Sequence, residues 1–320
     1  MMKATLIFGV FFALFGSAMA TTTWTVTTNR DSGPQSLRSI LERAGDGDRV
    51  VFALRAGEEN ISLTSALSVE GKSIHIDGRN RNMDAKRIVT LQVRIPGQSP
   101  YRVFHLNPGH ERTVRLEHLI LRGGDVSGVA DNAFGGVVFL ERDGNLQLTG
   151  CTVRDGRARE GGGIYAGGRF HRGRLTLREC DIFGNEAVAE GGIAAGGGVY
   201  VSFGWTVIHS TLIYENAARS HSGGIVIFNA GGTISNSAIV GNTLLSGASS
   251  EGSFTGPLLN FVRSRFRGEK IVASVHTRNH VVLPRVDMGM ISSGRKERLH
   301  TPFPLAARVH AGITAVVDTP

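Results

Sequence analysis

Cysteine is scarce in this chain, which has only Cys151 and Cys180 among its 320 residues. Two thiols cannot form the multi-bridge framework that holds small secreted folds together. Neither cysteine has a CxxC partner or the ligand spacing of a structural zinc site. The sequence therefore predicts no metal centre and no cofactor.

Aromatic residues are also few, with 16 Phe, 4 Tyr and 2 Trp. An aliphatic core is therefore expected. Glycine is abundant instead, because 43 glycines are roughly twice the average usage. This composition indicates a chain that turns often.

Long apolar runs are absent after the N-terminus. Lys3, the apolar run Leu6–Gly16 and the small residues Ala18–Ala20 together have the pattern of a secretory signal peptide. The run is too short to span a bilayer. The pattern predicts cleavage after residue 20 and a mature chain that begins near Thr21. No later segment is long and apolar enough to predict a transmembrane helix.

The charge of the chain is unevenly distributed. The formal net charge is +8, but residues 261–320 hold ten basic and four acidic side chains. The body of the mature chain is therefore nearly neutral and lacks the basic footprint of a nucleic-acid-binding protein. The sequence predicts no nucleic-acid partner.

Two short elements alternate along the chain, one of each per unit. The first is Gly-Gly followed by an aliphatic residue, at positions 135–137, 162–164, 197–199 and 223–225. The second is Ile-x-x-Asn, at positions 182–185, 213–216 and 239–242. A fixed alternation of this kind is the signature of a repeat architecture.

Aligning the units shows columns of similar residues at spacings of 32, 29, 31 and 26. The anchors of this alignment are Leu119, Cys151, Cys180, Thr211 and Ser237. Two columns are wholly aliphatic, as inward positions of stacked coils should be. They are Leu116, Leu148, Leu177, Ile208 and Ile234, and Leu121, Val153, Ile182, Ile213 and Ile239. The column between them is polar, which predicts the alternation of a strand.

Five residues after each anchor, the column contains only glycine and asparagine: Gly124, Gly156, Asn185, Asn216 and Asn242. Both residue types tolerate a left-handed backbone. We therefore expect a left-handed turn in this column, with the stacked asparagines bonded amide to amide. Cys151 and Cys180 share another column and are expected as buried neighbours, for which a disulfide is allowed but not required.

Coils of 26 to 32 residues fit about three short strands each, which predicts an all-β parallel β-helix. A tandem array of hairpins would need two-residue Asn-Gly or Asp-Gly turns, which the repeats lack. Gly33–Gly45 has helical spacing of apolar residues and is expected to cap the solenoid, followed by a strand at Arg49–Leu54. We divide the chain into a signal peptide (1–20), a cap with the first coils (21–100), repeat coils (101–250) and a basic tail without assigned structure (251–320), expected to be peripheral to the core.

These repeats resemble those of right-handed parallel β-helix proteins of the pectin-lyase-like superfold. They are most similar to exported proteins with polymorphic outer membrane protein repeats, which pair a Gly-Gly-Ala-Ile-like element with a Phe-x-x-Asn-like one. Gly162–Ile164 and Ile213–Asn216 match these elements, and Thr27–Phe52 is similar to the N-terminal cap of such proteins. The resemblance implies a right-handed solenoid at the cell surface or outside the cell, with an adhesive or interaction role.

The same superfold includes polysaccharide lyases and hydrolases, so the fold alone does not assign function. A calcium-dependent lyase would need clustered carboxylates and a base, for which Asp155, Asp181, Arg154 and Arg178 are the candidates. Their carboxylates do not share a column, which disfavours the enzyme. Calcium is expected only if this alternative holds.

We therefore favour an exported scaffold for surface interaction, adhesion or glycan binding, whose partner is an extracellular glycan or a surface protein. Tyr165 and Tyr200 are the candidates for stacking on sugars, although a place at the edge of the core is the simpler interpretation. Five histidines, at positions 105, 118, 171, 209 and 221, are scattered without metal-ligand spacing.

Overall fold

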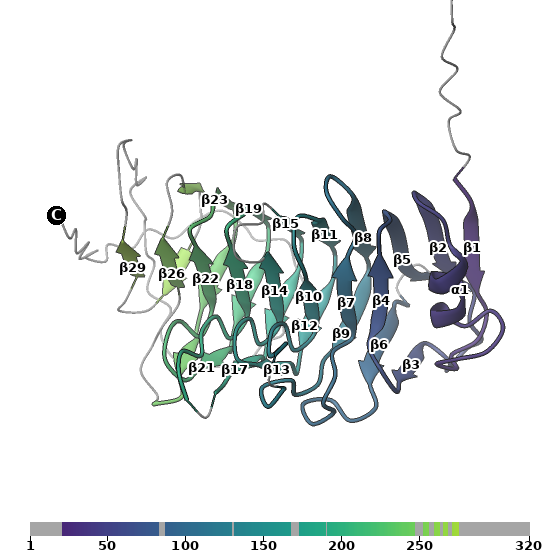
Figure 1. Cartoon of the computed structure of the whole chain (residues 1–320), viewed down its shortest axis with the longest axis horizontal. Coiled ribbons are helices and arrows are strands. Elements are labelled where there is room, and N and C mark those ends of the chain that lie inside the picture. The colour runs from purple at the N-terminus through teal and green to yellow at the C-terminus, as the bar shows by residue number, and fades with distance from the viewer. Residues whose placement is uncertain are drawn as a thin grey trace, which may run out of the picture.

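The computed structural model describes residues 21–82, 87–129, 131–167, 173–189 and 191–246, and the backbone of four strands between 252 and 274. These residues form an elongated parallel β-solenoid whose strands stack along the long axis (Figure 1). The predicted signal peptide and residues 275–320 lie outside the described residues.

Each coil contributes one strand to each of three long sheets, and the strands within a sheet are parallel. Sheet A contains β1 (Thr23–Val26), β2 (Asp48–Phe52), β5 (Ile74–Asn80), β8 (Thr113–Glu117), β11 (Asn145–Thr149), β15 (Arg174–Arg178), β19 (Trp205–His209), β23 (Gly231–Ser235) and β27 (Leu259–Val262). Sheet B contains β3 (Asn60–Leu63), β6 (Val89–Val93), β9 (Leu119–Arg122), β12 (Thr152–Arg154), β16 (Asp181–Phe183), β20 (Leu212–Tyr214), β24 (Ala238–Val240) and β28 (Arg265–Arg267).

Sheet C faces the viewer in Figure 1, and a short fourth sheet runs along its lower edge. Sheet C contains β4 (Leu67–Glu70), β7 (Phe104–Asn107), β10 (Val138–Leu140), β14 (Ile164–Gly167), β18 (Val199–Ser202), β22 (Ile225–Phe228), β26 (Gly252–Thr255) and β29 (Ile271–Ser274). Sheet D contains β13 (Arg157–Ala158), β17 (Glu186–Ala187), β21 (Ala217–Ala218) and β25 (Thr243–Leu244). The all-β parallel solenoid predicted from the sequence is confirmed.

The N-terminal end of the solenoid is covered by α1 (Leu37–Arg43), as the spacing of apolar residues predicts (Figure 1). Ser36 is the N-cap, and its side chain accepts a hydrogen bond from the Ser39 amide. Leu37, Ile40 and Leu41 are buried against the first coils. The helix is seven residues long, and no helix in the described part of the chain has the length and apolar character needed to cross a membrane.

The aliphatic columns read from the sequence are in register in the structure. Leu116, Leu148 and Leu177 pair in sheet A, and Val153 and Ile182 pair in sheet B. All of these side chains are fully buried. The interior is therefore a stack of aliphatic rungs, and the intervening polar column lies on the outer face of sheet A.

The repeat alignment contains one error of register. Val138, and not Val137, pairs with Ile164 in sheet C. Gly136 is therefore equivalent to Gly162, because this coil has Val137 where the next has Gly163.

The expected left-handed turn is also displaced by one residue. Asn185, Asn216 and Asn242 do not have positive φ, so that expectation is wrong. The left-handed corner is the residue before this column: Asp155 (62°), Gly184 (63°), Glu215 (51°) and Gly241 (67°). The asparagine side chains instead lie inside the coils, where they are buried.

The asparagines form the expected ladder along the axis. Asn185 Nδ2 donates to Asn216 Oδ1 at 3.0 Å, and Asn216 Nδ2 donates to Asn242 Oδ1 at 3.0 Å. The same oxygens accept backbone amides of the preceding coil at 3.1 and 3.0 Å. The ladder therefore satisfies buried polar groups at a corner where no sheet pairing is available.

Four strands continue the solenoid beyond residue 250. β26 pairs with β22, β27 with β23, β28 with β24, and β29 with β26. The sequence of this region contains no recognisable Gly-Gly or Ile-x-x-Asn element. Sheets A, B and C therefore extend into the segment that was expected to be peripheral.

Candidate functional site

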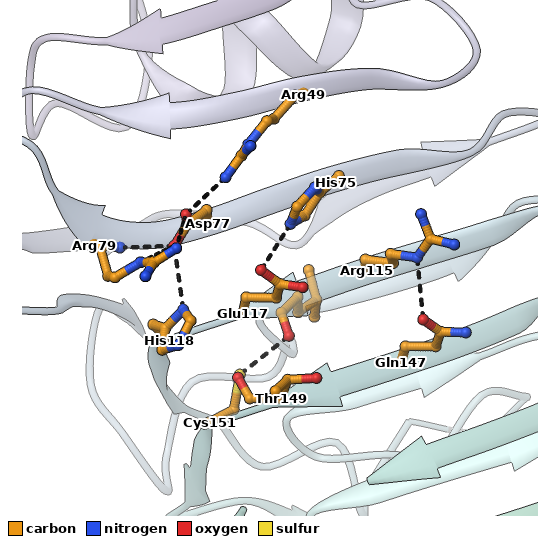
Figure 2. Close-up of polar contacts among 11 residues, drawn as sticks. Arg49, His75, Asp77, Arg79, Arg115, Glu117, His118, Gln147, Thr149 and Cys151 are labelled. Atoms are coloured by element: carbon orange, nitrogen blue, oxygen red, sulfur yellow. Dashed lines mark hydrogen bonds and ion pairs between the residues drawn. The ribbon is translucent and has the colours of Figure 1, made fainter. Parts of the chain in front are cut away.

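The outer face of sheet A carries a strip of mainly polar side chains, and its N-terminal part holds a cluster around Asp77. Arg79 Nε donates to Asp77 Oδ1 at 3.0 Å, and Arg79 Nη2 donates to Oδ2 at 2.8 Å. Arg49, on the neighbouring strand β2, donates to Oδ2 at 2.9 Å. Figure 2 shows the carboxylate between the two guanidinium groups.

Two histidines join this cluster, His75 from β5 itself and His118 from the next coil (Figure 2). His118 Nδ1 lies 3.2 Å from Asp77 Oδ1. His75 Nε2 lies 3.0 Å from Glu117 Oε2 on β8. His118 has a left-handed backbone with φ of 52° and a side chain that is one-third exposed. The corner thus turns the His118 ring back toward the strand that carries Asp77.

The electrostatics of the cluster keep Asp77 ionised. Burial by itself would raise the pKa of the Asp77 carboxyl, but the hydrogen bonds and charge of Arg79, with a further bond to His118, outweigh it. The pKa of Asp77 is therefore held well below its usual range. A permanently charged carboxylate can orient His118 through Nδ1 and leave Nε2 for another proton.

A metal ion fits this cluster poorly. Ligand atoms of Asp77, Glu117 and His118 lie within 4.8 Å of one another, which is close enough for shared coordination. However, both oxygens of Asp77 already accept from guanidinium groups. Two arginine charges beside a carboxylate oppose a divalent cation at the same oxygens. We therefore assign no metal to these residues.

The C-terminal part of the same strip has a different character, and we call it the acid-free face. It consists of the outward positions of β11, β15, β19 and β23, none of which is Asp or Glu. Its residues are Asn145, Gln147, Thr149, Arg174, Thr176, Arg178, Trp205, Val207, His209, Gly231, Thr233 and Ser235. The outer face of sheet A therefore divides into a charge-balanced cluster and an acid-free face.

Trp205 is an exposed aromatic residue of this face, with 37% of its surface accessible. It pairs with Arg174 on one side and with Gly231 on the other. Because Gly231 has no side chain, its strand position cannot cover the ring. This arrangement leaves an indole available to a ligand.

The structure brings three of the four residues proposed for a lyase to one side of the solenoid and places Arg178 apart from them. Arg154, Asp155 and Asp181 lie on sheet B and its adjoining corner, whereas Arg178 is on the outer face of sheet A. Asp155 accepts from Arg122 Nε at 2.8 Å and lies 3.7 Å from Arg154 Nη1. Asp155 is thus engaged by two arginines.

The two tyrosines proposed for sugar binding stack on each other instead. Tyr165 and Tyr200 occupy neighbouring outward positions of sheet C, with ring centroids 5.3 Å apart and 9° between planes. Tyr165 is only 6% exposed, and burial raises its pKa to about 12. A sugar would have to displace neighbouring rings to reach its face.

A similar aromatic ladder lies on sheet B. Phe183 and Tyr214 have ring centroids 4.9 Å apart, and the Arg154 guanidinium lies over Phe183. Both faces of Phe183 are therefore occupied. These rings stabilise the stacking of coils and present mainly their edges to solvent.

The two cysteines are buried and free. The Asp181 amide donates to the Cys151 carbonyl at 2.9 Å, which places the two cysteine positions on adjacent coils as expected. Burial raises the pKa of Cys180 to about 12 and raises that of Cys151 well above its usual value. Both thiols are therefore poor nucleophiles.

Sequence reasoning missed both the Asp77 cluster and the exposure of Trp205. The pattern His75-x-Asp77 in a predicted strand was a signal, since alternate residues share a face. The pairing with Glu117 and His118 was hidden by the 40-residue separation of Asp77 and Glu117, longer than the other repeats. His171 lies outside the described residues, and His105 contacts Glu141 on sheet C rather than joining this site.

Comparisons with known proteins add no functional assignment. No family model, no curated protein and no solved structure matches this chain.

Proposed function

We propose that this protein is an exported β-solenoid scaffold that binds a polysaccharide on the outer face of sheet A. The observation that carries this proposal is the exposed indole of Trp205 beside Gly231. Aromatic rings offer apolar area at a low entropic cost and suit the C–H face of a sugar ring. The other aromatic ladders have their faces occupied by one another.

The repetition of the solenoid supports a polymeric ligand. Successive strands of sheet A lie ~4.8 Å apart and present outward side chains in register. A polymer with a short repeat can therefore contact several coils at once, which increases its overall affinity. A single small molecule would use only one or two of these positions.

The proposal also includes the handedness of the solenoid, its relationship to known repeat proteins and its location outside the cell. Right-handed winding is supported by the general preference of parallel crossover connections. The Gly-Gly and Ile-x-x-Asn elements support a relationship to pectin-lyase-like proteins with polymorphic outer membrane protein repeats. The predicted signal peptide supports secretion or display at the cell surface.

Retention of the mature chain on immobilised polysaccharides tests the proposal. Trp205→Leu should abolish most of the retention, because leucine keeps an apolar side chain but removes the ring face. Trp205→Phe should retain part of it. Equal binding by all three proteins would contradict a role for the indole, and retention only on a protein-coated surface would favour a protein partner.

A polysaccharide-cleaving enzyme is the second candidate, favoured by the contact between Asp77 and His118. His118 held at Nδ1 could act as a general base through Nε2. Incubation with acidic polysaccharides, with and without calcium, should then release new unsaturated or reducing ends. His118→Ala should remove this activity and leave polysaccharide retention intact. Absence of new ends under all conditions would exclude this candidate for the polymers tested.

A further inference from the structure

We infer that the ligand of the acid-free face is an anionic polysaccharide, held by Arg174 and Arg178 beside Trp205. This inference rests on the proposed function and adds the charge of the ligand. Arg174 and Arg178 are both exposed and are the first and last residues of β15. Among the described residues, neither forms an ion pair, whereas Arg49 and Arg79 of the N-terminal cluster both do.

The two halves of the outer face of sheet A differ in charge. In the Asp77 cluster, each carboxylate lies against a basic side chain, so the local charge is balanced. In the acid-free face, two guanidinium groups occupy outward positions that include no carboxylate. The exposed Glu179 follows Arg178 at the corner and is not one of the outward strand positions. The face is therefore locally cationic on a body whose sequence is nearly neutral.

The spacing of the arginines suits a multiply charged ligand. Four residues along a strand separate Arg174 from Arg178 by roughly 13 Å. The four strands of the face extend over roughly 14 Å across the sheet. An area of this size accommodates a short oligosaccharide segment, with two anionic groups reaching the two guanidinium groups. Guanidinium groups bind carboxylates and sulfates through paired hydrogen bonds.

The remaining residues of the face favour a sugar polymer over other polyanions. Trp205 is in register with Arg174, so a sugar ring on the indole lies beside a guanidinium group. The flanking positions Thr233, Ser235 and His209 can exchange hydrogen bonds with hydroxyl groups, and His209 Nδ1 already contacts Ser235 Oγ at 2.9 Å. A nucleic-acid site would be expected to have a larger basic footprint than two arginines. An anionic polysaccharide would contact both the guanidinium groups, through its acidic groups, and the hydroxyl and imidazole side chains, through its own hydroxyl groups.

The test uses two polymers that share a backbone, dextran sulfate and uncharged dextran, with polygalacturonate as a carboxylate-bearing probe. We expect the full chain to bind dextran sulfate and polygalacturonate more tightly than dextran. Because charge contributes to the binding, the affinity should fall as salt rises from ~50 mM to ~500 mM. Single-stranded DNA serves as a polyanion without sugar hydroxyl faces of the same kind.

The variant Arg174→Gln/Arg178→Gln should weaken binding to both anionic polymers by about tenfold or more, equivalent to ~1.4 kcal/mol. Arg30→Gln/Arg94→Gln removes the same net charge from two exposed side chains that lie away from the acid-free face and, among the described residues, form no ion pair, and it should change binding less than about twofold. Thermal unfolding of both variants should match that of the original chain, because these side chains are exposed. If Arg174→Gln/Arg178→Gln fails to fold, Arg178→Gln alone supplies the comparison.

The outcomes separate this inference from the proposed function. Tight binding to dextran that depends on Trp205 but not on the arginines would overturn the anionic assignment and leave the scaffold proposal standing. Equal loss of binding in both double variants would show a nonspecific effect of net charge and would also overturn it. Binding of DNA as tight as that of dextran sulfate would replace the polysaccharide by a general polyanion. No retention on any polysaccharide would remove both proposals.

Discussion

At the scale of single residues, a difference of one position decides whether a side chain forms a corner or a ladder. Glu215 has a φ of 51° and makes the turn, whereas Asn216 follows it and is buried. Glycine and asparagine in one column suggested a left-handed backbone, but asparagine is used here for its side-chain amide. Its Nδ2 donates to carbonyls of two different coils, those of Ile182 and Tyr214.

This register predicts that glycine is tolerated at the first position and destabilising at the second. Glu215→Gly should change the free energy of unfolding by less than about 1 kcal/mol, because glycine adopts the left-handed conformation without strain. Asn216→Gly should lower it by ~1–3 kcal/mol, because the buried backbone N–H of Asn185 loses its acceptor, the Asn216 Oδ1. Asn216→Leu should be at least as damaging. Urea unfolding of the three variants measures these differences. If Asn216→Gly leaves the free energy of unfolding unchanged, the side-chain ladder is not what requires asparagine here, and a left-handed backbone becomes the better explanation.

The lowered pKa of Asp77 predicts acid sensitivity. Because the pKa is lower in the folded state than in the unfolded chain, this carboxylate stabilises the fold above about pH 4 and loses its contribution as the pH falls further. Asp77→Asn should lower stability near neutral pH by ~1–3 kcal/mol and flatten the acid limb of the stability curve. Denaturant unfolding from pH 7 to pH 3 measures both effects. Parallel curves for the two proteins would show that Asp77 does not govern this limb.

At the scale of elements, the spacing between coils is set by glycines that face the backbone of the next coil. A Cβ at Gly162 would lie 2.4 Å from the Glu186 carbonyl oxygen and 2.5 Å from that of Gly197. The equivalent Gly197 would meet the Ala217 carbonyl at 2.1 Å. The Gly-Gly element therefore allows the corners that precede sheet C in successive coils to approach one another as closely as the paired strands do.

Gly162→Ala should consequently destabilise the solenoid by ~1–3 kcal/mol or more, since a backbone carbonyl must move. Gly191→Ala is the matched control, because a Cβ there meets nothing within 4 Å. It should leave the free energy of unfolding within about 0.5 kcal/mol of the original. Circular dichroism during thermal unfolding distinguishes the two, and equal melting temperatures would contradict the close-packed corner.

At the scale of the whole molecule, the two ends of the solenoid are covered by different elements. The N-terminal end carries α1, and β1 pairs with β2, so β2 is not an edge strand of sheet A. At the other end, β26, β27 and β28 cover the edges of β22, β23 and β24. β26 lies within residues 247–257, a stretch rich in glycine and serine that has the composition of a linker, which explains why the sequence pattern did not indicate a further coil.

Removal of residues 251–320 should therefore expose three strand edges rather than release a peripheral tail. Exposed edges pair with other chains, so we expect the shortened protein to associate or precipitate while retaining β-structure. Light scattering after size-exclusion chromatography measures this association. Truncation after residue 275 is the control, because it keeps β26, β27, β28 and β29. If the protein that lacks residues 251–320 is monodisperse and unfolds cooperatively, the tail is peripheral to the core and this prediction is wrong.

The sequence alone determined the solenoid, because stacking makes the repeat columns equivalent to contacts. A buried aliphatic residue such as Leu148 must lie on Leu116 if the coils repeat, so periodicity predicts the core directly. The capping helix and the asparagine ladder were predictable for the same reason, since both depend on local or repeated signals. The tertiary structure decided which outward residues meet, because these contacts connect coils of unequal length. Asp77 and His118 are 41 positions apart, and their contact depends on how far each connecting loop carries the chain before the next strand begins.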